Sequence, residues 1–327
     1  MSENLLEVED LSVSYLTDTA DIGAVEHVSL SVHAGEFLGI VGESGCGKST
    51  LLFAIAQLLS PPAAITSGRV VFKGQDLVQL SENSLRLVRW RDYSVVMQSA
   101  MNALNPMKSI GAQFADTIRA HEHMSPVGIK ARSAEVLHLV GIDAAHLESY
   151  PHQLSGGMRQ RAMIAMALLF TPQLVIMDEP TSALDVVAQR SLMTQIKDLQ
   201  QQLGFAVIFV THDMSVVANY SDRVMVMYAG QVAELGETKS IFDRPLHPYS
   251  KGLLDAFPSV RGPRRPLIGI PGSPPDLGRP PTGCRFHPRC NVAMPQCTTT
   301  EPELYDVDDA QVRCLLFAEH AAPVATR

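Results

Sequence analysis

The stretch GESGCGKST, residues 42–50, matches the phosphate-loop pattern G-x-x-x-x-G-K-[ST]. It follows the apolar run FLGIVG (residues 37–42) and opens the helical pattern STLLFAIAQLL (residues 49–59), as a strand–loop–helix phosphate site requires. The glycines let backbone N–H groups converge on phosphate oxygens, and the helix N-terminus adds a positive dipole. We expect Lys48 to reach the β- and γ-phosphates and Ser49 to ligate Mg²⁺. The predicted nucleotide-binding residues of this stretch are Gly42, Glu43, Ser44, Gly45, Cys46, Gly47, Lys48, Ser49 and Thr50.

Two carboxylates at the end of another apolar run suit the hydrolysis of a phosphate bond. Asp178 and Glu179 close the run LVIMDE, residues 174–179. One carboxylate can hold Mg²⁺ through water, while the other can orient or deprotonate the attacking water. We assign Asp178 to the Mg²⁺ side and Glu179 to catalysis.

The order of apolar and polar runs indicates an α/β fold. The runs at residues 37–42, 174–179 and 205–213 stay apolar until their polar ends, as in parallel strands covered on both faces. Residues 5–16, LLEVEDLSVSYL, alternate apolar with polar side chains, which predicts a half-buried antiparallel strand. Helical spacing at residues 109–149 predicts a helical insertion. We therefore expect a parallel central sheet with sites at its carboxyl ends.

The run LSGGMRQ, residues 154–160, resembles the LSGGxxQ signature of the ABC family of ATPases. Further elements of that family follow in the expected order: Tyr15, Gln98, the SALD run at residues 182–185, and His212. The resemblance covers residues 5–256. It implies an ABC-type P-loop ATPase with a RecA-like parallel sheet core, an antiparallel β subdomain and a helical subdomain at about residues 100–160. It also implies ATP and Mg²⁺ as ligands.

The resemblance implies a role for each side chain. Tyr15 would stack on adenine, because an aromatic face suits a flat base. Gln98 would contact Mg²⁺ and the attacking water, and His212 would hydrogen-bond the γ-phosphate. Catalysis is thereby assigned to Glu179, His212, Gln98 and Lys48, and Mg²⁺ ligation to Ser49, Gln98 and Asp178.

The signature also implies partners. It opens a helix whose N-terminus suits an anion, so Ser155, Gly156 and Gly157 would bind the ATP of an opposite subunit, with Asp185 at the same junction. The family resemblance implies a second, homologous ATPase subunit in a heterodimer, two membrane permease subunits and an extracytoplasmic solute-binding protein. The chain itself would lie on the cytoplasmic face of a bacterial or archaeal cell membrane.

The tail, residues 257–327, begins with a Pro- and Gly-rich linker and holds four cysteines. Its runs HPYS (residues 247–250, just before the linker) and GCRFHPRC (residues 283–290) resemble ATPases of the dipeptide, oligopeptide and nickel importers. That resemblance implies a structural [4Fe-4S] cluster on Cys284, Cys290, Cys297 and Cys314, whose thiolates suit such a cluster. Zinc ligation and reduced, unliganded thiols stay open as alternatives.

The solute is expected to be a peptide, with an oligosaccharide as the alternative. Peptide-importing relatives read QDPMTSLNP where this chain reads QSAMNALNP at residues 98–106, a variant that resembles members importing short sugars. That segment would face the permease rather than the solute, so it reports lineage only.

Composition and motif content exclude other classes. A formal net charge of −8 argues against a nucleic-acid partner. The apolar run at residues 162–170 is far shorter than the about 20 residues that cross a bilayer, and the acidic N-terminus does not resemble a secretory signal. A soluble ABC ATPase of DNA repair or translation would need a long coiled-coil insertion or a second ATPase domain. Glu179 and His212 together argue against a non-hydrolysing regulator.

Overall fold

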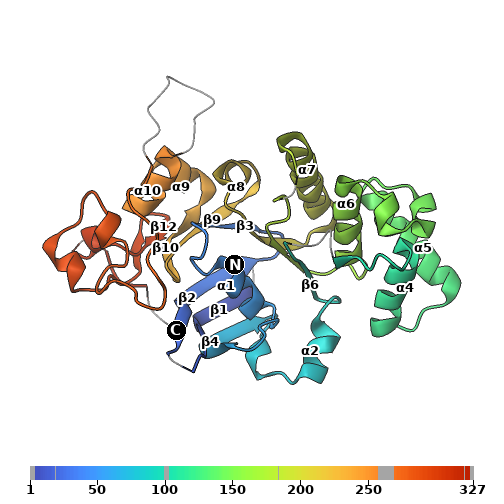
Figure 1. Ribbon diagram of the computed structural model, residues 1–327, viewed down its shortest axis with the longest axis horizontal. Helices are drawn as coiled ribbons and strands as arrows, with labels where there is room; N and C mark the ends of the chain where they lie inside the picture. Colours follow the sequence, from blue (N-terminus) through green and yellow to red (C-terminus); the bar gives the residue numbers. More distant parts are fainter. Residues whose placement is uncertain are drawn as a thin grey trace. The chain divides into compact units, whose positions relative to one another are not determined.

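The computed structural model describes residues 4–18, 20–98, 103–182, 184–256, 269–319 and 321–324. The chain divides into two compact units. Figure 1 labels the helices and strands of both. Among the described residues, the phosphate-loop unit comprises those within 4–32, 37–78 and 210–324, and the signature unit those within 33–36 and 79–209. Part of the linker predicted after residue 256, and residues 99–102 and Ala183 of the predicted family segments, lie outside the described residues.

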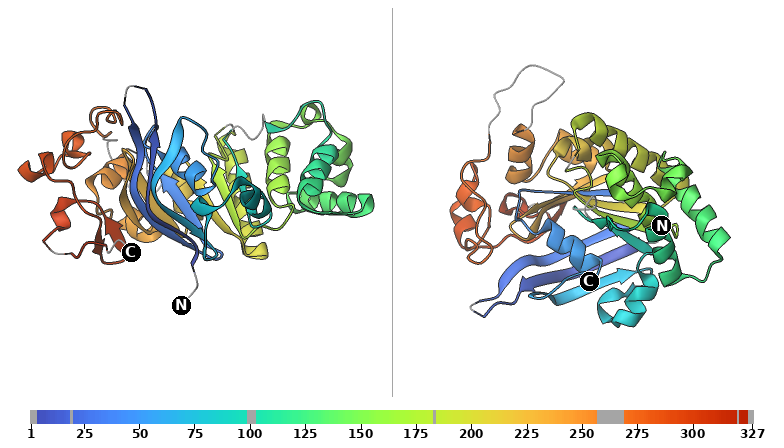
Figure 2. Two further views of the ribbon diagram at one scale, coloured as in Figure 1. Left: turned by 90° about the horizontal axis from the view of Figure 1, so that it is seen from below. Right: turned by 45° about the vertical axis from the view of Figure 1, so that its right-hand side comes forward.

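The phosphate-loop unit contains an antiparallel sheet of order β2-β1-β4-β5. Its strands are β1 (Asn4–Tyr15), β2 (Ile22–His33), β4 (Ala63–Phe72) and β5 (Gln75–Asp76). β1 pairs antiparallel with β4, with Leu6 opposite Phe72. The prediction that the first strand is antiparallel is thus confirmed. Figure 2 shows this sheet from two further sides.

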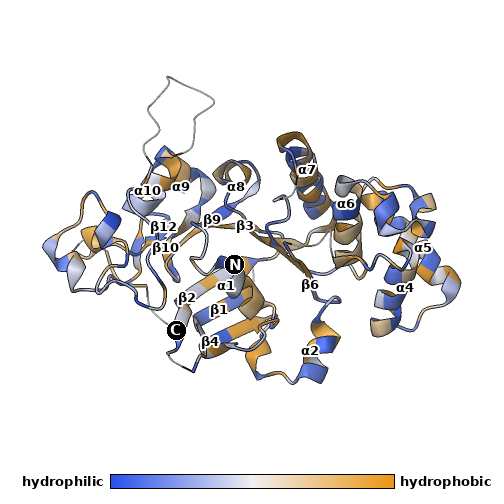
Figure 3. Ribbon diagram, viewed as in Figure 1, coloured by the Kyte–Doolittle hydropathy of each residue, from blue (hydrophilic) through white to orange (hydrophobic). Residues whose placement is uncertain are grey.

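A second set of strands in the same unit carries the phosphate loop. Its order is β11-β12-β10-β9-β3. The strands are β3 (Phe37–Val41), β9 (Arg223–Tyr228), β10 (Gln231–Glu237), β11 (Tyr305–Val307) and β12 (Ala310–Val312). β3 pairs parallel with β9, whereas β10 is antiparallel to both β9 and β12. The tail therefore extends this sheet through β12. Figure 3 shows the central strands β3 and β9 as hydrophobic, in keeping with their burial.

Short helices connect these strands. They are α1 (Lys48–Ile55), α8 (Met214–Tyr220), α9 (Thr238–Asp243) and α10 (Pro248–Asp255), with the 3₁₀ turns η1 (Leu77–Gln79), η4 (His287–Arg289), η5 (Pro295–Thr298) and η6 (Leu315–Phe317). Asp213 precedes α8 as its N-cap, and its carboxylate accepts a hydrogen bond from the Ser215 N–H. Such a cap satisfies a backbone donor that the helix leaves unpaired.

The signature unit combines three strands with five helices among its described residues. The strands β6 (Tyr93–Val96), β7 (Leu174–Asp178) and β8 (Ala206–Val210) lie in the order β8-β7-β6, and β6 and β7 are parallel. The helices are α2 (Glu82–Val88), α4 (Ile110–His121), α5 (Pro126–Leu139), α6 (Gly156–Ala167) and α7 (Val186–Leu203). The 3₁₀ turns η2 (Ala144–Glu148) and η3 (Pro151–Gln153) precede the signature.

The helical insertion predicted at residues 109–149 is formed by α4, α5 and η2. Ser109 and Ser125 begin the two helices, each accepting a backbone N–H from the residue three positions on. α4 buries Ile110, Phe114 and Ile118, which recur at helical spacing. In the part of the chain that the structure describes, no helix is both long and apolar enough to span a bilayer.

Candidate functional site

The phosphate loop joins β3 to α1 and requires glycine at two positions. Gly42 has a φ of 152° and Gly47 a φ of 101°, both in the region that side chains other than glycine disfavour. A Cβ on Gly42 would lie 2.3 Å from the Met227 carbonyl oxygen, and one on Gly47 would lie 2.2 Å from the Ala24 carbonyl oxygen. The backbones of β9 and β2 therefore lie too close to Gly42 and Gly47, respectively, for either position to carry a side chain.

Lys48 folds back over this loop. Its Nζ donates hydrogen bonds to the carbonyl oxygens of Gly42 and Glu43, each at 2.8 Å, and its side chain is buried. α1 begins at the left-handed Gly47 without a side-chain cap. An uncapped helix start beside a buried ammonium fits the phosphates of a nucleotide. Burial raises the pKa of the neighbouring Cys46 thiol, which keeps it neutral.

Tyr15 reaches the start of the same helix. Its hydroxyl lies 3.1 Å from the Oγ1 of Thr50. β1 thus places the aromatic ring beside the phosphate-loop helix. Stacking of this ring on adenine stays a prediction.

His212 belongs to the same unit and is exposed. In the chain it follows β8 and directly precedes Asp213, the capping residue of α8. Its contact with the γ-phosphate stays a prediction.

The signature unit brings Gln98 and Glu179 together. The buried Asp178 ends β7, and Glu179 follows it directly. The Gln98 Nε2 donates to the Glu179 Oε2 at 2.6 Å. Glu179 has a φ of 43°, a conformation rare for residues other than glycine. Such backbone strain gathers where a side chain must be held at one angle for function.

The signature residues open α6. The hydroxyl of Ser155 accepts the Met158 N–H at 3.2 Å and so caps the helix. A Cβ on Gly157 would meet nothing within 4 Å, so packing within this chain leaves space above the first turn. The amide of Gln160, the last signature residue, donates to the Pro180 carbonyl and so binds the helix to the residue that follows Glu179.

Asp185 has a local role as well as a predicted one. Its carboxylate accepts the Ala188 N–H at 2.8 Å and caps α7. The predicted site residues are thus divided between the units. The phosphate-loop unit holds Tyr15, Gly42 to Thr50 and His212, and the signature unit holds Gln98, Ser155, Gly156, Gly157, Asp178, Glu179 and Asp185.

The four tail cysteines gather in the tail without forming a ligand set. Cys284 donates its N–H to the Cys297 carbonyl, and the Met294 N–H points to the Cys297 Sγ at 3.4 Å. Burial raises the pKa of Cys284, Cys290 and Cys314, the last to about 11. Among the described residues, however, no group of three or more His, Cys, Asp or Glu side chains is arranged to hold a metal ion. The described residues therefore lend no support to the predicted iron–sulfur cluster, which stays a prediction.

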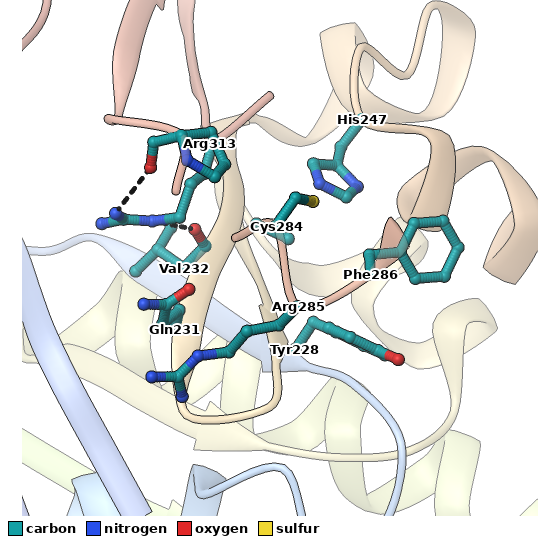
Figure 4. A pocket seen from close by; sticks show the side chains of 10 residues that line it. Tyr228, Gln231, Val232, His247, Cys284, Arg285, Phe286 and Arg313 are labelled. Carbon is teal, nitrogen blue, oxygen red and sulfur yellow. Dashed lines mark hydrogen bonds between the residues drawn. The ribbon is translucent and has the colours of Figure 1, made fainter. Parts of the chain in front are cut away.

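The tail packs on β9, β10 and α10 around a small pocket (Figure 4). Arg313 donates to the carbonyl oxygens of Val232 and Pro302, and Arg285 pairs with Glu26 and donates to the Ala229 carbonyl. His247 also lines the pocket, and its Nδ1 accepts the Tyr249 N–H. Burial lowers the pKa of His247 to about 4, so the ring is neutral at physiological pH.

Sequence reasoning missed two residues that contact the phosphate loop. Arg289 of η4 forms an ion pair with Glu43, and the Tyr249 hydroxyl accepts the Glu43 N–H. Both residues lie in the HPYS and GCRFHPRC runs, but these runs indicated lineage and no contact. Only the packing of α10 and η4 in the structure reveals that they meet Glu43.

Family models match most of this architecture. Residues 25–182 match the ABC transporter model, and residues 233–297 match the model of the oligopeptide/dipeptide transporter C-terminal region. The chain is 44% identical over 326 residues to the dipeptide transport ATP-binding protein DppD of Bacillus subtilis, covering 98% of this chain and 97% of the relative. It is 43% identical over 303 residues to the oligopeptide transport ATP-binding protein OppD of Escherichia coli, covering 92% and 90%.

Solved structures agree on the fold. An ATP-binding cassette in a dimeric post-hydrolysis state, bound to ADP and phosphate, is similar with a TM-score of 0.64 and 29% identity over 71% of this chain and 98% of that one. The protein cbiO1 of Clostridium perfringens, part of the ABC transporter complex cbiONQ, is similar with a TM-score of 0.65 and 27% identity, covering 74% and 92%.

Proposed function

Because this chain belongs to the ABC transporter family of ATP-binding proteins, we propose that it hydrolyses MgATP to drive the import of peptides through separate permease subunits. The observation that carries the ATPase part is the phosphate loop, where two glycines admit no side chain and Lys48 folds over the loop. The peptide part is supported by the relatives, which are dipeptide and oligopeptide transport ATP-binding proteins. The similarity extends over nearly their whole length.

Each predicted site residue has a place in the proposed reaction. Lys48 would exchange its two loop carbonyls for phosphate oxygens. Ser49, Asp178 and Gln98 would hold Mg²⁺, which neutralises charge on the phosphates when bound. Glu179, oriented by Gln98, would align the attacking water, with His212 at the γ-phosphate. Tyr15 would take the adenine, and Ser155, Gly156, Gly157 and Asp185 would take the nucleotide of an opposite subunit.

The proposed assembly follows the family. Two permease subunits, a homologous ATPase subunit and an extracytoplasmic solute-binding protein would complete the importer, with this chain on the cytoplasmic face of the membrane. Residues 5–256 would form the ATPase domain, with its helical subdomain at about residues 100–160, and residues 257–327 the extension.

One experiment tests both the solute and the assembly. We expect the complex purified from its native host to contain one copy each of this chain and a sibling ATPase. Peptide-loaded binding protein should stimulate its ATPase activity, whereas oligosaccharide-loaded protein should not. Stimulation only by the oligosaccharide-loaded protein would show that this ATPase belongs to a sugar importer, the alternative suggested by residues 98–106. A complex with two copies of this chain would rule out the sibling ATPase.

We also propose that the four tail thiols ligate a [4Fe-4S] cluster once iron is supplied. The proposal is supported by their gathering in a Pro-rich segment with few large apolar side chains, since small segments of this kind commonly rely on a metal to fold. Anaerobic purification should give a brown protein with about four irons. Replacing Cys284, Cys290, Cys297 or Cys314 by serine should remove the brown colour, whereas Cys46→Ser should leave it unchanged. A colourless protein with one zinc, or with no metal, would contradict the cluster.

A further inference from the structure

Glu43, the second residue of the phosphate loop, is bound by residues that lie outside the loop. The guanidinium of Arg289 donates from Nη1 to the Glu43 Oε2 at 2.6 Å and from Nη2 to Oε1 at 2.9 Å. The Tyr249 hydroxyl accepts the Glu43 N–H at 2.9 Å. With Lys48 on its carbonyl oxygen, Glu43 is therefore bound at its amide, its carbonyl and both carboxylate oxygens.

Arg289 is fixed on all sides. Its side chain is 6% exposed, and that of Glu43 is 25% exposed. The Nε donates to the Pro271 carbonyl at 2.8 Å, Nη1 also reaches the Tyr228 hydroxyl at 3.4 Å, and the guanidinium lies 5.8 Å from the Tyr228 ring centroid. A paired, planar fork of this kind has one orientation, and because Arg289 is buried, loss of its carboxylate partner would be costly.

The backbone around Arg289 is equally constrained. Arg289 ends η4, a turn between Cys284 and Cys290 in which the Arg289 N–H bonds the Phe286 carbonyl. The Phe286 ring packs on Tyr228 and Tyr249, with centroids 5.2 and 5.4 Å away. One aromatic cluster thus positions both residues that contact Glu43.

The sign of the charges gives this contact a functional meaning. A phosphate loop collects positive potential for a polyanion, and a carboxylate on the loop opposes it. Glu43 supplies such a carboxylate, and the only cation that the structure pairs with it among the described residues is Arg289. The ion pair cancels the negative charge of Glu43, and its two hydrogen bonds hold the carboxylate against Arg289.

We propose that Arg289 is a positioning residue for MgATP: it neutralises Glu43 and, together with Tyr249, holds the first turn of the phosphate loop in its binding conformation. The proposal rests on the proposed function, because it presumes that the loop binds MgATP. It makes the C-terminal extension a part of the nucleotide site rather than an appendage. Arg289 itself need not touch the nucleotide.

The test is the dissociation constant of MgATP for the full-length chain. We expect Arg289→Gln to weaken MgATP binding about tenfold, the scale of one unscreened charge near a triphosphate. The double variant Glu43→Gln/Arg289→Gln removes both charges and should recover most of the affinity. Arg289→Lys keeps the charge without the fork and should lie between the two. Adenosine, which carries no phosphate, should bind all variants alike.

Arg313→Gln is the matched control. It also removes a largely buried tail arginine that donates to backbone carbonyls, but Arg313 bonds Val232 and Pro302 rather than the loop. It should lower the thermal unfolding temperature without changing the dissociation constant of MgATP. Thermal unfolding of every variant checks that affinity is compared between folded proteins.

The outcomes separate the two proposals. A wild-type chain that fails to bind MgATP would overturn the proposed function. Wild-type affinity in folded Arg289→Gln and Arg289→Lys would overturn the positioning role. Equal losses in Arg289→Gln and in the double variant would overturn the neutralisation of Glu43, because the affinity would then not depend on its charge.

Discussion

Glu179→Gln should slow ATP hydrolysis by the assembled transporter about a hundredfold or more, the scale expected when general-base or water-orienting help is lost. The variant keeps the shape of the side chain, and its amide oxygen can still accept the Gln98 Nε2 that now lies 2.6 Å from the carboxylate. It loses only the charge and the ability to take a proton. Steady-state phosphate release measures the effect.

Binding of MgATP should survive this change. Glu179 lies one residue beyond the buried Asp178, which we assign to Mg²⁺, and outside the phosphate loop. The exposed Glu148, in the same unit, offers a matched control, because Glu148→Gln removes one carboxylate without touching the predicted site. Undiminished phosphate release by Glu179→Gln would show that another group activates the water.

The sequence predicted those parts of the site that are local in the chain. A phosphate loop is one continuous stretch, so its pattern identified the strand, the turn and the helix together. In the same way, the apolar run before Asp178 and Glu179 predicted a buried strand that delivers both carboxylates, and β7 ends at Asp178 with Glu179 directly after it. The helical insertion and the first antiparallel strand followed from periodicity, because the apolar residues of each recur at the spacing of its element.

What the sequence could not predict are contacts made across the chain. Arg289 and Glu43 are separated by 246 positions, and their pairing depends on how η4 packs against Tyr228. The runs that contain Arg289 and Tyr249 indicated a lineage, which says nothing of what their side chains contact. The cysteines show the same limit, since the family resemblance implied a cluster, while no metal-holding group is found among the described residues.

The structure also changes the reason for the glycines of the phosphate loop. Their sequence pattern indicated freedom of the backbone N–H groups to face phosphate. The structure adds that Gly47 and Gly42 lie against the backbone of neighbouring strands, whereas Gly45 has nothing within 4 Å of the position of a Cβ. Loop glycines with one role in the pattern should therefore differ widely in their tolerance of substitution.

Gly47→Ala should lower the free energy of unfolding by roughly 3 kcal/mol or more and abolish MgATP binding. The new Cβ would lie 2.2 Å from the Ala24 carbonyl oxygen, an approach that neither atom can relieve without moving backbone. Forcing a left-handed φ of 101° on alanine costs about 1 to 3 kcal/mol, and overpacking adds about as much. Any shift of Gly47 also displaces Cys46, whose carbonyl accepts the Gly230 N–H at 2.9 Å.

Gly45→Ala is the matched control, because it adds the same methyl group at a position where a Cβ has no neighbour within 4 Å. Its φ of 78° is also left-handed, so alanine there should cost only about 1 to 2 kcal/mol of strain. Urea unfolding of both variants measures the difference, with circular dichroism as the probe. Equal losses of unfolding free energy would mean that backbone strain alone accounts for both effects. The β2 backbone would then move to accommodate a side chain at position 47. The larger loss at Gly47 would instead establish that the loop is held in its phosphate-binding conformation by direct contact with the antiparallel sheet.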